Sequence, residues 1–147
     1  MKSSHIIFII MLMCCNDIIA QEPLSSLSLF DGRYNNRKGA VEVLVKGKKL
    51  KPYNLTLFRS LTLKTDSTEI QKISEMVESD AKKATEKETG NIGGKLYYGF
   101  FCFGGNKETN QYLFFRNAYL RDKDDPEIIV IYMEGYAKLD EIKKMFE

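Results

Sequence analysis

Two short segments dense in aromatic residues, 96–103 and 112–120, constrain the fold of this chain more than any other feature. Each carries rings at both odd and even positions, and a loop rich in glycine and asparagine, 104–110, lies between them. Aromatic residues are enriched in strands, so two such runs around a glycine-containing loop predict a β-hairpin. Because successive side chains of a strand point to opposite faces, we expect both faces of this hairpin to carry rings.

Three further segments have strand patterns. Residues 41–46 alternate valines with Glu42 and Lys46, and residues 55–63 alternate leucines with threonine and serine. Such period-two alternation predicts strands with one polar face. The run Ile128–Met133, within 127–134, is apolar at nearly every position, which favours a central strand that is covered on both faces.

Helical spacing appears twice. Asp66 followed by Glu69 resembles a capping box, and apolar residues then recur at helical spacing, which predicts a helix over 67–88 that stops at Thr89-Gly90-Asn91. A short amphipathic helix is expected at 139–146. The predicted order is therefore ββαβββα, an α+β domain over residues 21–147 whose mainly antiparallel sheet has about five strands.

The first twenty residues have the pattern of a secretory signal peptide. Lys2 precedes an unbroken apolar run, Ile6–Cys15, and Ala20 offers a small residue at the cleavage point. We expect cleavage after Ala20 and an exported protein, either periplasmic or secreted. An alternative is lipidation at Cys14 or Cys15, which would anchor the chain in the cell envelope.

The remaining chain lacks the residues that most protein chemistry uses. The only histidine, His5, lies within the predicted signal peptide, and Cys102 is the one cysteine after it. Most acid–base catalysis and most zinc sites use histidine or paired cysteines. We therefore expect no enzymatic activity, no catalytic residues, no metal and no cofactor. Because Cys102 lies between two phenylalanines in a predicted strand, we expect its thiol to be buried.

Two segments resemble ligand-binding loops without matching them. Gly90–Lys95 has three residues between its outer glycines, where a phosphate-binding loop has four, and no serine or threonine follows the lysine. Asp122–Glu127 contains four carboxylates but has no glycine at its sixth position, where a calcium-binding EF-hand loop needs one. We interpret both segments as turns.

Candidate contact residues come from the aromatic strands and from a basic segment near the start of the domain. The predicted helices offer few apolar residues, so part of the aromatic sheet is expected to stay uncovered and to contact a partner. Tyrosines suit the rim of such a patch because their hydroxyl groups tolerate water. The candidates are Tyr97, Tyr112, Tyr119, Arg33, Tyr34, Lys48 and Lys49. The competing interpretations are core packing for the rings and a lysine-protected edge hairpin for the basic residues.

The end of the chain carries a resemblance to known proteins. Ile131–Gly135 is followed by Leu139–Met145, after a layout in which one helix separates two sets of strands. This pattern resembles small exported bacterial proteins that are grouped as domains of unknown function. The resemblance implies an envelope location and a non-enzymatic role, and it implies no activity or site residues.

The sequence favours a non-catalytic exported or envelope protein, a binding module for a protein or a glycan. Two alternatives stay open. One is a small hydrolase that works without histidine, through carboxylates or a Ser/Lys pair. The other is a structural component that self-associates through its sheet as a homodimer. Nucleic acid is not an expected partner of an exported protein, and membrane contact is expected only if Cys14 or Cys15 is lipidated.

Overall fold

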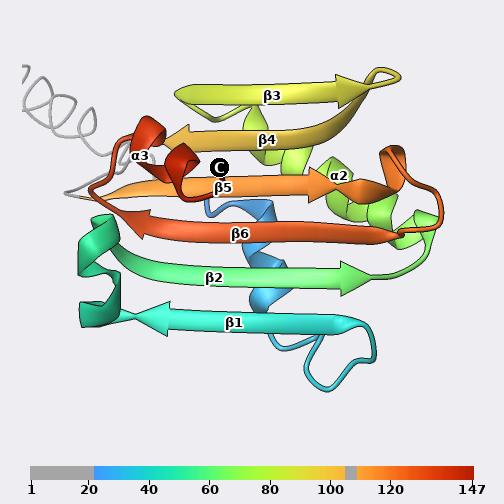
Figure 1. Cartoon of the computed structure of the whole chain (residues 1–147), viewed down its shortest axis with the longest axis horizontal. Helices are drawn as coiled ribbons and strands as arrows, with labels where there is room; N and C mark the ends of the chain where they lie inside the picture. The colour runs from blue at the N-terminus through green and yellow to red at the C-terminus, as the bar shows by residue number, and fades with distance from the viewer. Residues whose placement is uncertain (1–21, 105–108) are drawn as a thin grey trace, which may run out of the picture.

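An antiparallel six-stranded sheet of order β1-β2-β6-β5-β4-β3 forms the centre of the protein (Figure 1). The computed structural model describes residues 22–104 and 109–147, so the predicted signal peptide with Cys14 and Cys15 lies outside the described residues. The strands are β1 (Ala40–Lys46), β2 (Leu55–Lys64), β3 (Glu86–Ile92), β4 (Lys95–Phe103), β5 (Asn110–Asn117) and β6 (Glu127–Gly135). The helical elements are the 3-10 helices η1 (Ser25–Phe30), η2 (Gly47–Tyr53) and η3 (Ala118–Leu120), and the α-helices α2 (Ser67–Ala81) and α3 (Leu139–Lys144). The predicted α+β class and the largely antiparallel sheet are confirmed.

The prediction of about five strands missed β3. The helix expected over 67–88 ends at Ala81, and the residues expected to stop it belong to β3, which pairs with β4 at the edge of the sheet. Its sequence, EKETGNI, has little strand propensity, but an edge strand needs no continuous apolar face. Gly93 and Gly94 join β3 to β4 with φ angles of 57° and 76°, which two-residue hairpin turns require. The Gly90–Lys95 segment is thus part of a hairpin.

Other boundaries also differ from the prediction. The second aromatic strand ends at Asn117 instead of residue 120, and Tyr119 lies in η3. The basic residues after β1 lie in η2, which Asn54 ends in the left-handed conformation with φ of 58°. The acidic turn before β6 is held by the Asp122 carboxylate, which accepts a hydrogen bond from the Asp124 amide at 2.9 Å. β6 is central, as its apolar sequence predicted.

The two faces of the sheet are covered by different elements. In Figure 1, α2 and η1 lie behind the sheet and α3 lies in front of it. We call these the α2 face and the α3 face. The larger core lies on the α2 face and includes Leu61, Leu63, Ile73, Val77, Phe101, Phe115 and Val130. The smaller core lies on the α3 face and includes Leu50, Leu55, Cys102, Tyr112, Phe114, Met133 and Ile142.

The start of α2 confirms one half of the predicted capping box. The Asp66 carboxylate accepts a hydrogen bond from the Glu69 amide at 2.9 Å, which satisfies a free donor of the first turn. The Glu69 carboxylate does not reach back to Asp66. It accepts hydrogen bonds from both terminal nitrogens of Arg37, at 3.0 and 2.6 Å, and from the Thr65 hydroxyl. This bidentate pair ties the 31–39 loop to α2.

The Arg37–Glu69 pair predicts a pH-dependent contribution to stability. Hydrogen bonds from Arg37 hold the pKa of Glu69 below its ordinary value of 4.5. A carboxyl group with a lowered pKa stabilises the fold above its unfolded-state pKa, and this stabilisation is lost as the pH falls through the folded-state pKa. In urea titrations, Glu69→Gln is therefore expected to lower the free energy of unfolding at neutral pH and progressively less below pH 4.5. An effect that does not change with pH would contradict this role.

Asp80 joins the N-terminal segment to α2 near the end of that helix. Its carboxylate is fully buried and accepts hydrogen bonds from the amides of Ser25 and Ser26, at 2.7 and 2.8 Å, and from the Ser26 hydroxyl at 2.6 Å. The first amides of a helix have no partner within it, and this carboxylate supplies one for η1. The contact spans more than fifty residues of sequence and holds η1 against the α2 face.

Candidate functional site

A cavity of about 430 Å³ lies between α2 on one side and the β3–β4 turn and η3 on the other. We call it the α2 cavity. Its walls are formed by side chains of α2, by Lys95 and Leu96 at the start of β4, by Asn117 at the end of β5, and by Tyr119, Leu120 and Lys123. The residues contributed by α2 are Ser67, Ile70, Gln71, Ser74, Glu75 and Glu78. The cavity therefore combines apolar surface with many hydrogen-bonding groups.

Asn117 is the most distinctive residue of this cavity. It is 4% exposed, and its Oδ1 atom has no hydrogen-bond partner within residues 22–104 and 109–147. Buried polar groups are nearly always hydrogen-bonded, and an unpaired one costs about 1–3 kcal/mol. The Asn117 Oδ1 atom is thus a buried acceptor without a partner, in a residue that lines the cavity.

The charges around the α2 cavity are balanced. Glu75 and Glu78 lie on α2, one turn apart, while Lys95 and Lys123 line the opposite wall. The Lys123 ammonium group lies 4.0 Å from the centre of the Tyr119 ring. Two acidic and two basic side chains leave no net charge of either sign, so the cavity does not select an anion or a cation by its charge.

The three tyrosines predicted as partner contacts do not share one surface. Tyr119 is half-buried and lines the α2 cavity. Tyr97 is also half-buried, and the Arg121 guanidinium group lies 5.1 Å from its ring centre. Tyr112 is 1% exposed and belongs to the core of the α3 face, where its hydroxyl donates to the Ala137 carbonyl group. The prediction that Tyr112 lies on a wet rim is wrong, because this hydroxyl finds its partner inside the protein.

The aromatic strands are not the uncovered part of the sheet. Phe146, just beyond α3, stacks on Phe114 with ring centres 4.8 Å apart and an interplanar angle of 13°. The Phe100 ring centre lies 5.7 Å from that of Phe146. The prediction of an exposed aromatic patch is therefore wrong, since Phe146, which follows α3, covers these rings. The most exposed large apolar side chains of the sheet belong instead to β1.

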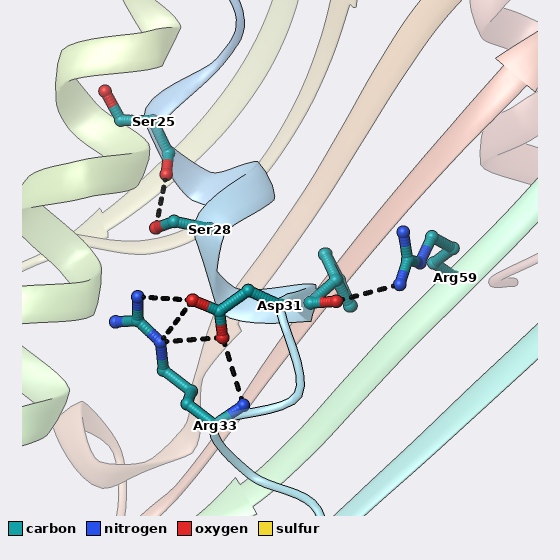
Figure 2. A network of polar contacts seen from close by, with 6 residues as sticks. Ser25, Ser28, Asp31, Arg33 and Arg59 are labelled. Carbon is teal, nitrogen blue, oxygen red and sulfur yellow. Dashed lines mark hydrogen bonds and ion pairs between the residues drawn. The ribbon is translucent and has the colours of Figure 1, made fainter.

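The basic segment does not form one surface either. Arg33 is exposed and pairs with Asp31 at 2.9 Å, which lowers the pKa of Asp31 to about 2 (Figure 2). Arg59 from β2 donates to the Phe30 carbonyl group at 2.9 Å and so ties the end of η1 to the sheet (Figure 2). Tyr34 is 4% exposed, and its ring packs in the α2-face core instead of on the predicted basic surface.

Lys48 and Lys49 are exposed in η2, after the C-terminal end of β1, whereas Arg33 lies in the loop before its N-terminal end. β1 therefore separates the two halves of the predicted basic surface (Figure 1).

Asn117 and the polar residues of α2 were not predicted as site residues. The sequence carries no signal for them, because Asn117 is a single polar residue at a strand end and the α2 residues read as a solvated helix face.

Cys102 lies where its aromatic neighbours in the sequence predicted. It is buried on the α3 face, and burial raises the pKa of its thiol, with a smaller contribution from Glu86. A buried thiol with a raised pKa is a poor nucleophile. In the described part of the chain, no group of three or more His, Cys, Asp or Glu residues is arranged to hold a metal ion.

Comparison with known protein families identifies the family of this chain. A model of the family of unknown function DUF6108 matches residues 12–146, and the chain therefore belongs to that family. This confirms the resemblance to domains of unknown function. No curated protein and no solved structure matches the chain. Within residues 22–104 and 109–147, no helix is long and apolar enough to cross a membrane.

Proposed function

We propose that this protein is a non-catalytic, exported binding module whose α2 cavity accepts an uncharged glycan. The proposal rests on one observation above all, the buried Asn117 side chain whose Oδ1 has no partner in the described structure and which lines the cavity. Export is supported by the signal-peptide pattern of residues 1–20.

Glycan chemistry fits the walls of this cavity. A sugar ring offers hydroxyl groups that both donate and accept, and Asn117, Gln71 and Ser74 present amide and hydroxyl groups on the cavity wall. Gln71 also donates to the Glu75 carboxylate and Ser74 to the Ile70 carbonyl group, so their remaining lone pairs are what a sugar hydroxyl can bind. A sugar also has an apolar C–H surface, for which Tyr119 and Leu96 supply apolar contact. The balanced charges favour a neutral ligand over a phosphate or a polycation.

The proposal is tested by glycan-array binding followed by titration calorimetry with the glycan that binds best. Asn117→Leu keeps the approximate shape of the side chain and removes its polar atoms, so it is expected to weaken binding about tenfold or more. The same change removes an unpaired buried polar group, so the free energy of unfolding is expected to stay the same or to rise. Tyr119→Ala is expected to weaken binding to a similar extent.

Tyr136→Ala provides the matched control, because Tyr136 is 51% exposed and does not line the cavity. This variant is expected to bind the glycan as the unmodified protein does. Full binding by Asn117→Leu, or no glycan binding at all, would contradict the proposal. Release of new reducing ends from the bound glycan would show that the protein is a hydrolase instead.

A further inference from the structure

The two edges of the sheet differ in how they are protected. β3 carries Glu86, Lys87 and Glu88, and its pairing with β4 shifts register between Gly90 and Asn91. Charged residues and an irregular register both discourage a further strand from adding to an edge. β3 therefore has the features of a closed edge.

β1 has the opposite character. It pairs with β2 in unbroken register from Ala40 to Lys46, and it contains no proline. Val41, Val43 and Leu44 are 61%, 44% and 54% exposed, so apolar side chains project from both faces of this edge strand. A regular, apolar edge with unpaired backbone groups is a template for another strand.

The sequence of β1 is complementary to itself when two copies run antiparallel about Leu44. Leu44 then lies opposite Leu44 of the second copy, each Val43 lies opposite a Val45, and each Glu42 lies opposite a Lys46. Cross-strand pairs of opposite charge and pairs of β-branched residues both stabilise a sheet. In the part of the chain that the structure describes, neither Glu42 nor Lys46 has an ion-pair partner.

The register with the axis one residue earlier lacks this match. With the two-fold axis at Val43, each Glu42 would lie opposite a Leu44 and each Lys46 opposite an Ala40, and all four charges would remain unpaired. Charge complementarity therefore favours the axis at Leu44 over the axis at Val43.

We infer that β1 is a homodimer interface, in which two copies pair through β1 about Leu44 and join their sheets into one. The α2 cavity lies beside β4 and β5, on the other side of β2 and β6, and stays clear of this edge. The inference is therefore independent of the proposed glycan site.

The test is the oligomeric state, measured by sedimentation velocity over a range of concentrations on protein purified from cells that express the full chain. The unmodified protein is expected to be a dimer. Leu44→Lys places two lysines at the two-fold axis and is expected to weaken association about tenfold or more. Because Leu44 is exposed, the circular dichroism spectrum and the melting temperature are expected to change little.

Two charge reversals test the register. Glu42→Lys and Lys46→Glu each place like charges opposite one another and are expected to weaken the dimer. A mixture of these two variants restores both pairs of opposite charges, so a heterodimer is expected to form from them. Glu86→Lys, the same charge change on the β3 edge, is the matched control and is expected to leave the dimer unchanged.

A protein that stays monomeric at every concentration would overturn the inference. A dimer that Leu44→Lys does not weaken would also overturn it, since the contact would then lie on another surface. Failure of the mixed variants to pair would overturn the Leu44 register, and a different polypeptide bound along β1 would overturn the choice of a second copy.

Discussion

Replacing Asp80 by alanine is expected to lower the free energy of unfolding by about 3 kcal/mol, measured by urea denaturation at neutral pH. The change removes a fully buried carboxylate that accepts three hydrogen bonds from Ser25 and Ser26. Hydrogen bonds to charged groups contribute more than neutral ones, and the truncation leaves donors of η1 without a partner.

The matched control for Asp80→Ala is Asp66→Ala, which removes an exposed acceptor at the other end of the same helix. The Asp66 carboxylate accepts one hydrogen bond, from the Glu69 amide, so its loss is expected to cost about 1 kcal/mol. Asp80→Ala is also expected to make η1 more sensitive to limited proteolysis, whereas Asp66→Ala is not. Equal losses of stability in the two variants would show that Asp80 does no more than an ordinary helix cap.

Gly135→Ala is expected to destabilise the protein by about 2 kcal/mol, because the new methyl group would overlap backbone atoms. A Cβ atom at Gly135 would lie 2.5 Å from the Asn54 carbonyl oxygen and 2.6 Å from the Leu55 Cα atom. Backbone atoms cannot rotate away as a side chain can. The same carbonyl oxygen accepts hydrogen bonds from the amides of Tyr136 and Ala137, so moving it would also weaken the connection between β6 and α3.

Gly104→Ala is the control for Gly135→Ala. A Cβ atom at Gly104 would meet only the Thr85 methyl group, at 3.7 Å, which is ordinary contact. Thermal denaturation followed by circular dichroism is expected to show a clear drop in melting temperature for Gly135→Ala and little change for Gly104→Ala. A Gly135→Ala variant as stable as the unmodified protein would mean that β6 and β2 separate at little cost.

The candidate site was the part of the molecule that the sequence predicted least well. Tyr119 was predicted as a contact residue and does line the α2 cavity, whereas Tyr112 and Tyr34 are buried in the two cores. All three are tyrosines at or near strand ends or in loops, and local sequence does not distinguish them. Asn117 was not predicted, because its burial depends on where α2 and η3 lie relative to the end of β5.

The sequence by itself determined the features that depend on neighbouring residues. Local patterns predicted the strands β1 and β2, the consecutive apolar residues of β6, the aromatic hairpin and the Asp66 cap. Only the tertiary structure decided β3, the Asp80 contact with η1, the cover of Phe114 by Phe146, and the exposure of β1. The last three depend on segments that lie far apart in the chain. β3 instead pairs with its sequence neighbour β4 across a two-residue turn, and it forms because β4 presents unpaired backbone groups to it, whatever the propensity of its own residues.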